Sequence, residues 1–364
     1  MATTLSHGVL VDYPSLTSDG IFTSGASTPI GIVGISTSGS ASADTPYLVN
    51  SKSEADLLFG TTLTESLALY LDILFRYGVT NVIAVKVANL AGIDAGITAL
   101  ATSQATLGIS PKLIALDDPS DTQIANVLST FPKAILFACP DSGFTVNEVL
   151  TSRISSTGYG TKSIRFVPCF PNLKNATTPT RIEPIAVHSV GLFAKSIYDR
   201  KGTLDNKPFV GVNGTSPSIT VGWESETADS EKLYDAGVLS INKTYDNTWV
   251  AWGNRNGIYP EDSGAMSYIS TVFARDTIAT GLSQLSQGWL GQPGSQALAS
   301  TLSATHDLWL SNNADTLTIS HGESRLNLVK SNFDPNAGEI KWVFDITIQM
   351  NFPIELIQIT IEVK

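Results

Sequence analysis

In the first two thirds of the chain, short apolar segments alternate with amphipathic ones, and this alternation limits the fold more than any other feature. The segments PIGIVGIS from Pro29 and NVIAVKVA from Asn81 are almost continuously apolar, which is typical of strands buried on both faces. Residues 64–77 carry large apolar side chains at helical spacing, and Gly78 follows as a stop signal. We therefore expect a mainly parallel, doubly wound α/β domain over residues 28–222.

Local signals place further elements in this domain. Ser51 and Glu54 have capping-box spacing ahead of a short helix that Gly60 ends, and Pro184 stands where the first turn of a long helix is expected. Strands are expected at residues 112–116, 134–138 and 164–170, and helices at residues 121–130, 145–155 and 184–201.

The pattern changes after residue 222. Residues 238–243 and 248–252 predict a β-hairpin, and helices are expected over residues 264–285 and 295–310, before a short strand at 317–320. Because strands and helices are segregated here, we expect a second domain of the α+β class over residues 223–338.

Both ends of the chain carry alternating strand sequence, which predicts extended β arms. Residues 1–27 are expected to hold a short strand and a Ser/Thr/Gly-rich linker, and residues 339–364 two strand runs. Such strands can add to the sheet of a neighbouring subunit. The candidate intersubunit strand residues are Val9, Val11, Tyr13, Ile357, Ile359, Ile361 and Val363.

The chain is poor in charge for its 364 residues. Charged residues make up 15%, against about 25% in typical domains, and residues 277–305 contain none. That stretch is interrupted by Gly, Ser, Gln and Pro293, so we do not interpret it as a membrane span. An uncharged surface of this extent suits burial against other protein.

The net charge of −11, without a compensating basic cluster, argues against direct binding of nucleic acid. The N-terminal residues lack a basic region followed by an apolar core, so no secretory signal is expected and the protein should be made and assembled in a cytoplasm. Cys139 and Cys169 each adjoin a proline after an apolar run, and we expect buried free thiols.

A doubly wound sheet invites an enzyme hypothesis, but the expected catalytic patterns are missing. The segment Gly31–Gly39 lacks the spacing of a phosphate-binding loop. Asp117 and Asp118 follow a strand, where α/β sites usually lie, yet Pro119 favours a turn that caps the next helix. The four histidines show no metal-ligand spacing. We therefore expect no catalytic residues, no metal and no cofactor.

His188 and Ser189 are adjacent on a predicted helix, so they cannot face each other as a base and a nucleophile. We expect His188 to be a surface histidine or one whose hydrogen bonds are satisfied in the core.

One segment is more specific: YDAGVLSINKTYDNTWVAWGNRNGIYP, from Tyr234. With HGV near the start, PIGIVG, PYLVNSKSEADLLFG, VIAVKV, and FDITIQMNFPIELIQITIEV near the end, it resembles the contractile tail sheath proteins of P2-like phages, R-type pyocins and related contractile injection systems. The resemblance covers about residues 7–87 and 234–363. It implies a structural role for its short motif Trp252, Gly253, Asn254 and Arg255.

The resemblance implies an outer α/β domain that is subtilisin-like but not catalytic, an inner α+β domain facing a tail tube, and arms exchanged between subunits. It implies hexameric rings stacked as a helical sheath, with tail tube, baseplate and tail terminator proteins as partners and no membrane insertion. The location would be the virion tail, after assembly in the cytoplasm of a bacterial host. Candidate tube-facing residues in the charge-poor region are Gln296, Leu298, Ser300 and Ser303.

By the same resemblance, the sheath would contract and drive the tube through a target cell envelope. Three alternatives stay open: a sheath of a non-phage injection system, a soluble α/β enzyme with an unfamiliar site, and another structural virion protein such as a tail tube. The long α/β region argues against the tube, whose subunits are small and mainly β.

Overall fold

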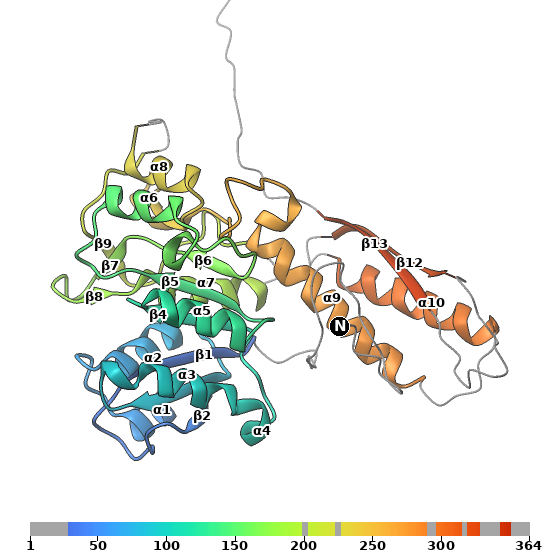
Figure 1. Ribbon diagram of the computed structural model, residues 1–364, viewed down its shortest axis with the longest axis horizontal. Helices are drawn as coiled ribbons and strands as arrows, with labels where there is room; N and C mark the ends of the chain where they lie inside the picture. The colour runs from blue at the N-terminus through green and yellow to red at the C-terminus, as the bar shows by residue number, and fades with distance from the viewer. Residues whose placement is uncertain are drawn as a thin grey trace, which may run out of the picture. The chain divides into compact units, whose positions relative to one another are not determined.

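The apolar segment that begins at Pro29 is the central strand of a six-stranded sheet in the computed structural model (Figure 1). The strand order is β2-β3-β1-β4-β5-β6, and all neighbours are parallel except the edge pair β2–β3. The chain winds outward from β1 in both directions, which is the doubly wound arrangement predicted from the sequence. The strands are β1 (Ile30–Ile35), β2 (Pro46–Val49), β3 (Val82–Val87), β4 (Leu113–Asp117), β5 (Ile135–Cys139) and β6 (Phe166–Pro168).

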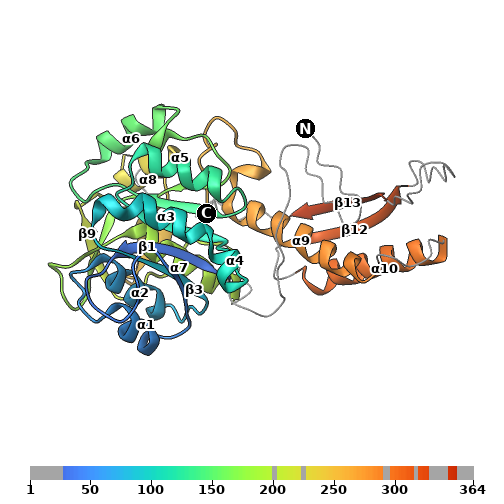
Figure 2. The ribbon, with the colours of Figure 1, turned by 60° about the horizontal axis from the view of Figure 1, so that its bottom comes forward.

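Helices cover both faces of this sheet (Figure 2). α2 and α7 pack on one face, and α3 and α5 on the other. The helical elements of this region are α1 (Lys52–Phe59), α2 (Ser66–Arg76), η1 (Leu90–Gly92), α3 (Ile93–Ala101), α4 (Ser103–Leu107), α5 (Asp121–Thr130), α6 (Val146–Ile154), η2 (Gly158–Gly160) and α7 (Ile185–Tyr198).

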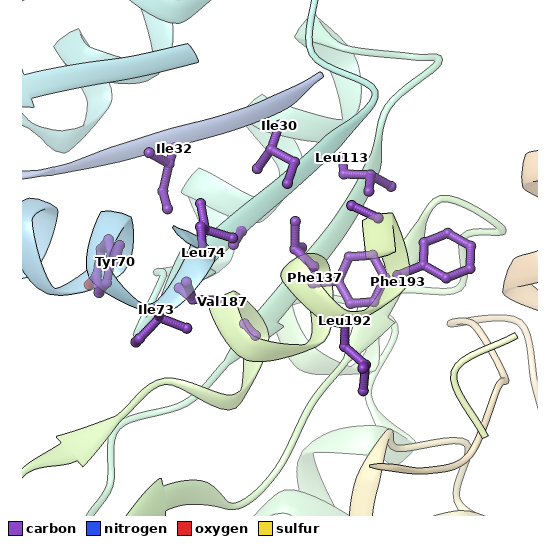
Figure 3. Packing of buried hydrophobic residues seen from close by; sticks show 14 of the residues in the cluster. Ile30, Ile32, Tyr70, Ile73, Leu74, Leu113, Phe137, Val187, Leu192 and Phe193 are labelled. Atoms are coloured by element: carbon purple, nitrogen blue, oxygen red, sulfur yellow. The ribbon is translucent and has the colours of Figure 1, made fainter. Parts of the chain in front are cut away.

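The alternation of side chains along each strand divides the core into two apolar layers. Ile30 and Ile32 of β1 belong to the layer shared with α2 and α7, whereas Val33 belongs to the layer under α3 and α5. Figure 3 shows the first layer, where Phe137 of β5 meets Phe193 of α7 with ring centroids 6.1 Å apart. Because both faces are covered, every parallel strand has to be apolar on both sides.

Gly34 shows why β1 contains glycine. A Cβ atom at this position would lie 2.9 Å from the Leu67 backbone of α2. The absence of a side chain therefore lets the helix backbone approach the strand.

A second, smaller sheet follows in the chain. Its order is β8-β7-β9, with antiparallel pairing throughout, and a separate hairpin pairs β10 with β11 in the register Ser240↔Trp252. The hairpin was predicted from the sequence, whereas the three-stranded sheet was not. These elements are β7 (Asn172–Asn175), β8 (Ile182–Glu183), β9 (Val212–Ser216), α8 (Asp229–Asp235), β10 (Ser240–Lys243), β11 (Trp249–Trp252) and η3 (Ala265–Ser267).

The structure describes residues 28–198, 203–222, 227–289, 296–314, 319–327 and 343–350; of 296–299, 319–327 and 343–350 only the backbone is described. The chain divides into two compact units, one ending at Phe273 and one starting at Ala274. We call the described residues up to Phe273 the body and those from Ala274 on the second unit.

The predicted domain boundary at residue 222 does not coincide with this division. Leu239 donates its N–H to the carbonyl of Pro168 at 2.8 Å, and its own carbonyl accepts from the Phe170 N–H at 2.9 Å. The buried guanidinium of Arg153 also donates to the carbonyl of Ala236 at 3.1 Å. Residues 227–273 therefore complete the body, and a functional division into outer and inner domains stays a prediction.

The second unit consists of two helices and a pair of strands. α9 (Ile269–Gln287) starts within the last residues of the body, and α10 (Gln296–Asn312) packs against β12 (Ile319–Asn327), which pairs with β13 (Val343–Met350) (Figure 1). The strands are antiparallel, with Arg325 in register with Asp345. β13 confirms the first of the two predicted C-terminal strand runs, and β12 is longer than expected.

In the described ranges, no helix has both the length and the hydropathy needed to cross a bilayer.

Candidate functional site

The carboxyl edge of the parallel sheet is where an α/β enzyme would bind its substrate. Asp117 ends β4 there and accepts hydrogen bonds from the Tyr70 hydroxyl (3.0 Å) and the Cys139 thiol (3.5 Å). Burial, opposed by these hydrogen bonds, raises the pKa of Asp117 to about 6. Both of these hydrogen bonds come from side chains of the sheet and its covering helix, so the carboxyl group of Asp117 is part of the packing at this edge.

The turn predicted at Asp117 and Asp118 is present, but these residues do not cap the next helix. Asp118 has a φ of 47°, a left-handed conformation that Asp tolerates. The N-cap of α5 is Ser120, which forms a reciprocal capping box with Gln123. No group of His, Cys, Asp and Glu side chains in the described chain is arranged to hold a metal ion. Both cysteines are free and buried, as predicted.

The glycine-rich segment after β1 does not form a phosphate site. The Lys86 ammonium donates to the carbonyls of Ser38 (2.8 Å) and Ala41 (3.3 Å), and the Ser36 hydroxyl donates to the carbonyl of Phe59 (2.7 Å). A phosphate loop presents backbone N–H groups to its ligand. Here two carbonyls of the loop accept hydrogen bonds from the half-buried ammonium of Lys86.

A polar cluster of the body centres on the fully buried side chains of Glu183 and His188, while its two arginines stay partly exposed; it was not predicted from the sequence. The Glu183 carboxylate of β8 accepts hydrogen bonds from Arg76 (2.8 Å), Arg181 (3.1 Å), Asn175 (2.8 Å) and His188 Nε2 (2.9 Å). Burial opposes its ionisation, but hydrogen bonding and charge from His188 and Arg76 lower the pKa of Glu183 to about 2. This cluster joins α2, α7 and the three-stranded sheet.

His188 is a core histidine with both ring nitrogens satisfied. Its Nδ1 lies 2.8 Å from the Tyr77 hydroxyl, which accepts from the Val210 N–H at 3.1 Å. The phenol therefore donates to Nδ1, and Nε2–H donates to Glu183, which fixes the neutral tautomer. Burial lowers the pKa of His188 despite the neighbouring carboxylate. The ring is fully buried, so this relay has no access to a substrate.

The predicted structural motif lies where β11 leaves the hairpin and meets the start of α9. Gly253, Asn254 and Arg255 are buried, but Trp252 is only half-buried, with its ring 5.9 Å from that of Tyr234. A Trp252→Ala change should therefore cost less than the roughly 3–5 kcal/mol typical of fully buried tryptophans. The guanidinium of Arg255 stacks between the rings of Tyr259 and Tyr268.

In the second unit, α9 and α10 pack through a close contact at Gly281. A Cβ atom there would lie 2.2 Å from the Trp309 ring, so only glycine allows this approach. Beside it, His306 Nε2 lies 3.0 Å from the Ser286 hydroxyl. One apolar cluster of buried side chains in this helix pair consists of Ala274, Ile278, Leu282 and Leu310.

The predicted tube-facing residues lie on α10, with different surroundings. Ser300 is exposed, Ser303 is half-buried, and only the backbone of Gln296 and Leu298 is described. The tube-facing assignment of these four residues stays a prediction. The exposed positions of α10 carry no charge, and among them Leu308 is 62% exposed. They are Ser300, Thr301, Ala304, Leu308, Ser311 and Asn312.

The predicted intersubunit strand residues lie outside the described residues. This applies to Val9, Val11 and Tyr13 and to the second C-terminal run from Ile357 to Val363. What the structure describes is the pair β12–β13, in which each strand has one hydrogen-bonding edge that pairs with no other described strand.

Comparison with known proteins tests the resemblance. No family model matches the chain. Over 177 residues the sequence is 26% identical to a tail sheath protein of Burkholderia phage BcepMu, a match that covers 46% of this chain and 37% of that relative. The chain thus spans little more than a third of the relative's length in this match.

Solved structures extend the likeness to the whole chain. The sheath complex of PVC, an extracellular contractile injection system, in its contracted state matches with a TM-score of 0.73 at 15% identity, over 100% of this chain and 98% of that one. The contracted helical sheath of the anti-feeding prophage matches with a TM-score of 0.69 at 17% identity, over 99% of both chains. The chain has the fold of the contractile tail sheath proteins.

Proposed function

We propose that this chain is the structural subunit of a contractile sheath and has no enzymatic activity. The observation that carries the proposal is the match over the full chain to two sheath proteins in contracted assemblies. The sequence relative is itself a tail sheath protein. The subunits would polymerise as stacked hexameric rings around an inner tail tube, and contraction would drive the tube through the envelope of a target cell.

In this proposal, residues 28–222 belong to the outer, subtilisin-like domain and the inner domain begins after them and faces the tube. The arms, residues 1–27 and 339–364, would add strands to the sheet of a neighbouring subunit. β12 and β13 each have an edge that pairs with no other strand among the described residues, which supports this arrangement because a strand edge can accept a strand from another chain. The tube contact would use the uncharged face of α10 that contains Ser300 and Leu308.

The partners would be further copies of this chain, the tail tube protein, and the baseplate and tail terminator proteins. A chain from the anti-feeding prophage baseplate has the same fold, with a TM-score of 0.71 at 16% identity, which supports the baseplate contact. The location would be a virion tail assembled in the host cytoplasm, with the sheath of a non-phage injection system as the alternative. Capsid and terminase genes beside this gene would decide for the phage.

The test is electron microscopy of the full chain produced with and without its tube protein. We expect hollow cylinders, and we expect a chain lacking residues 357–364 to keep the body folded but to form none. Circular dichroism and thermal unfolding provide the control for folding. Normal cylinders from the shortened chain would exclude strand donation by these residues, and discrete monomers from the full chain with tube present would exclude the sheath.

A further inference from the structure

The exposed face of α6 carries apolar side chains near both of its ends. Phe144, just before the helix, is 37% exposed, and Ile154, its last residue, is 84% exposed. Asn147 and Thr151 are exposed between them, and spacings of four and three positions place these two and Ile154 on one stripe of the helix. An open hollow in the surface is lined by Phe144, Asn147, Glu148, Thr151 and Ser152. Exposed apolar side chains beside a hollow suit contact with another protein surface.

A buried arginine joins α6 to two other segments of the body. Arg153 donates from Nε to the carbonyl of Ala236, at the end of α8, at 3.1 Å. Its Nη2 donates to the carbonyls of Gly257 at 3.3 Å and Tyr259 at 2.8 Å. Arg153 is buried, so these carbonyls replace water as partners of its guanidinium. α6, the end of α8 and the loop from Gly257 are therefore held together.

The surface made by these three segments is acidic. We define it as residues 144–155, 229–236 and 257–262 and call it the α6–α8 surface. Apart from Arg153, its only basic residue is Lys232, which pairs with Asp229 at 3.4 Å. Its acidic residues, of which Glu261 pairs with Lys162 at 2.7 Å, are Glu148, Asp229, Glu231, Asp235, Glu261 and Asp262. A partner that fits this surface has to present positive charge around an uncharged contact.

The hairpin formed by β7 and β8 has the opposite character. Its loop, residues 176–180, is exposed and uncharged, and it contains Pro179. Lys174 and Arg181 flank the loop and are partly exposed, whereas the acid of the hairpin, Glu183, is fully buried. The charge that the hairpin presents to its surroundings is therefore positive.

Asn175 holds the loop of this hairpin in shape. Its Oδ1 accepts from the N–H groups of Thr177 at 2.9 Å and Thr178 at 2.8 Å, and its side-chain amide donates to Glu183 at 2.8 Å. The Arg181 N–H donates to the Thr178 carbonyl at 2.8 Å and closes the turn. A loop that is ordered before it binds loses less conformational entropy on docking.

The loop and the α6–α8 surface lie apart in one copy of the body. Figure 1 shows the chain between β7 and β8 extending from the body at a distance from α6 and α8. The two can therefore meet only between copies. A contact between two different surfaces is heterologous, and its repetition builds a ring or an open helix. A helical sheath, the assembly proposed for this chain, requires contacts of this kind.

We propose that the β7–β8 hairpin of one copy docks on the α6–α8 surface of a neighbouring copy. The loop with Pro179 would cover the hollow between Phe144 and Ile154. Lys174 and Arg181 would face the carboxylates of the surface. This inference rests on the proposed sheath function and adds a contact between bodies to the strand donation by the arms.

Cysteine crosslinking of assembled cylinders tests this contact, because both native cysteines are buried. Thr180→Cys on the loop is combined with Thr151→Cys on α6 in the full chain, and cylinders are treated with a short bismaleimide before and after contraction. Each copy would be linked to the next, so we expect a ladder of covalent oligomers that is lost in each single variant. The matched control combines Thr151→Cys with Tyr245→Cys, which is also exposed but lies in another hairpin turn, and it should give no ladder.

The charge pairing is tested in the same crosslinking background. Lys174 takes no part in the hydrogen bonds of Glu183, and Lys174→Glu should reduce the ladder roughly tenfold because attraction becomes repulsion. Lys232→Glu is the matched control, since it makes the same change on the α6–α8 surface, which is already acidic, and should not reduce the ladder. Circular dichroism and thermal unfolding show whether each variant is folded.

The outcomes separate this contact from the sheath function. Wild-type cylinders with no ladder from the double cysteine variant, either before or after contraction, would overturn the docking. A ladder of equal strength from the control pair would overturn it as well, and a ladder unchanged by Lys174→Glu would overturn the charge pairing. Failure of wild type to form cylinders would overturn the sheath function itself.

Discussion

The body and the second unit bury their side chains in different ways. The body has an apolar layer on each face of its central sheet and, beyond them, a buried ionic cluster around Glu183. The second unit, as far as its side chains are described, has one small apolar cluster between α9 and α10, and α10 exposes a leucine. The described core of the body is therefore much larger than that of the second unit, although both expose large apolar side chains, among them Ile154 in the body (84% exposed) and Leu308 on α10 (62% exposed). Substitutions in the core of the body should therefore lower the free energy of unfolding, whereas a substitution on the exposed face of α10 should change assembly and leave that free energy almost unchanged.

The largest loss of stability is expected from Glu183→Ala. Removing this carboxylate leaves Arg76 and Arg181 without their common acceptor, and breaking a buried pair in this way costs roughly 3–5 kcal/mol. Chemical denaturation at pH 7 measures the change. The control is Glu261→Gln, since Glu261 is 58% exposed and pairs with Lys162 at 2.7 Å, and surface pairs contribute at most about 1 kcal/mol. Similar losses in both variants would contradict the view that buried polar contacts stabilise the body.

The lowered pKa of Glu183 predicts how the free energy of unfolding changes at acid pH. Its pKa is about 2 in the folded body and about 4.3 when unfolded, so the unfolded chain binds more protons between these values. The contribution of Glu183 is thus present above about pH 4.3 and is lost as the pH falls toward 2. The free-energy difference between wild type and Glu183→Ala should shrink across this window. A difference that stays constant down to pH 2.5 would contradict it.

Asp117 should act in the opposite direction. Its pKa is about 6 in the folded body and about 3.9 when unfolded, so its contribution is present below about pH 3.9 and is lost as the pH rises through 6. An asparagine does not titrate. Relative to wild type, Asp117→Asn should therefore gain roughly 2–3 kcal/mol between pH 4 and pH 8, measured by denaturation at both pH values. A relative stability that does not change with pH would show that Asp117 is not held in a raised-pKa environment.

For the second unit, Gly281→Ala tests the contact between α9 and α10. The added methyl group meets the Trp309 ring, and overpacking costs roughly 1–3 kcal/mol, partly offset by about 1 kcal/mol of helix propensity. Amide exchange in α9 and α10 should rise, while exchange in the central sheet stays at its wild-type level. Trp309→Leu in the same chain should relieve the clash. If the double variant loses as much free energy of unfolding as the two single variants together, the two residues are not in contact.

The sequence predicted the body better than the second unit, for a physical reason. Strands buried on both faces and helices with one apolar face leave periodic patterns, and these predicted β1, β3, β4, β5, α5 and α6 with only small errors in their bounds. The three-stranded sheet and the Glu183 cluster leave no such pattern. Glu183 and its partner Arg76 are 107 positions apart, and only the folded chain brings them together.

The same limit applies to the candidate site residues. The motif ending at Arg255 was found through resemblance, but its contacts with residues 266–270 arise from a loop that reverses the chain, which periodicity does not report. On α10, a 3.6-residue period places Ser300, Ala304 and Leu308 on one face, a pattern that the charge-poor composition of the whole region does not reveal.

The smallest effect on stability is expected from a substitution at Leu308, which should change assembly with the tube and not the free energy of unfolding. This side chain is 62% exposed on the uncharged face of α10, so Leu308→Glu should change the free energy of unfolding by no more than about 0.5 kcal/mol. If this face contacts the tube, a buried carboxylate without a partner there should prevent co-assembly with tube protein. Tyr245→Glu is the matched control, because Tyr245 is 87% exposed in the hairpin turn of the body. Microscopy and co-sedimentation with tube should show full decoration for Tyr245→Glu and little for Leu308→Glu. Loss of decoration in both would make the effect one of added charge, and a large drop in stability for Leu308→Glu would place Leu308 in the core of the second unit.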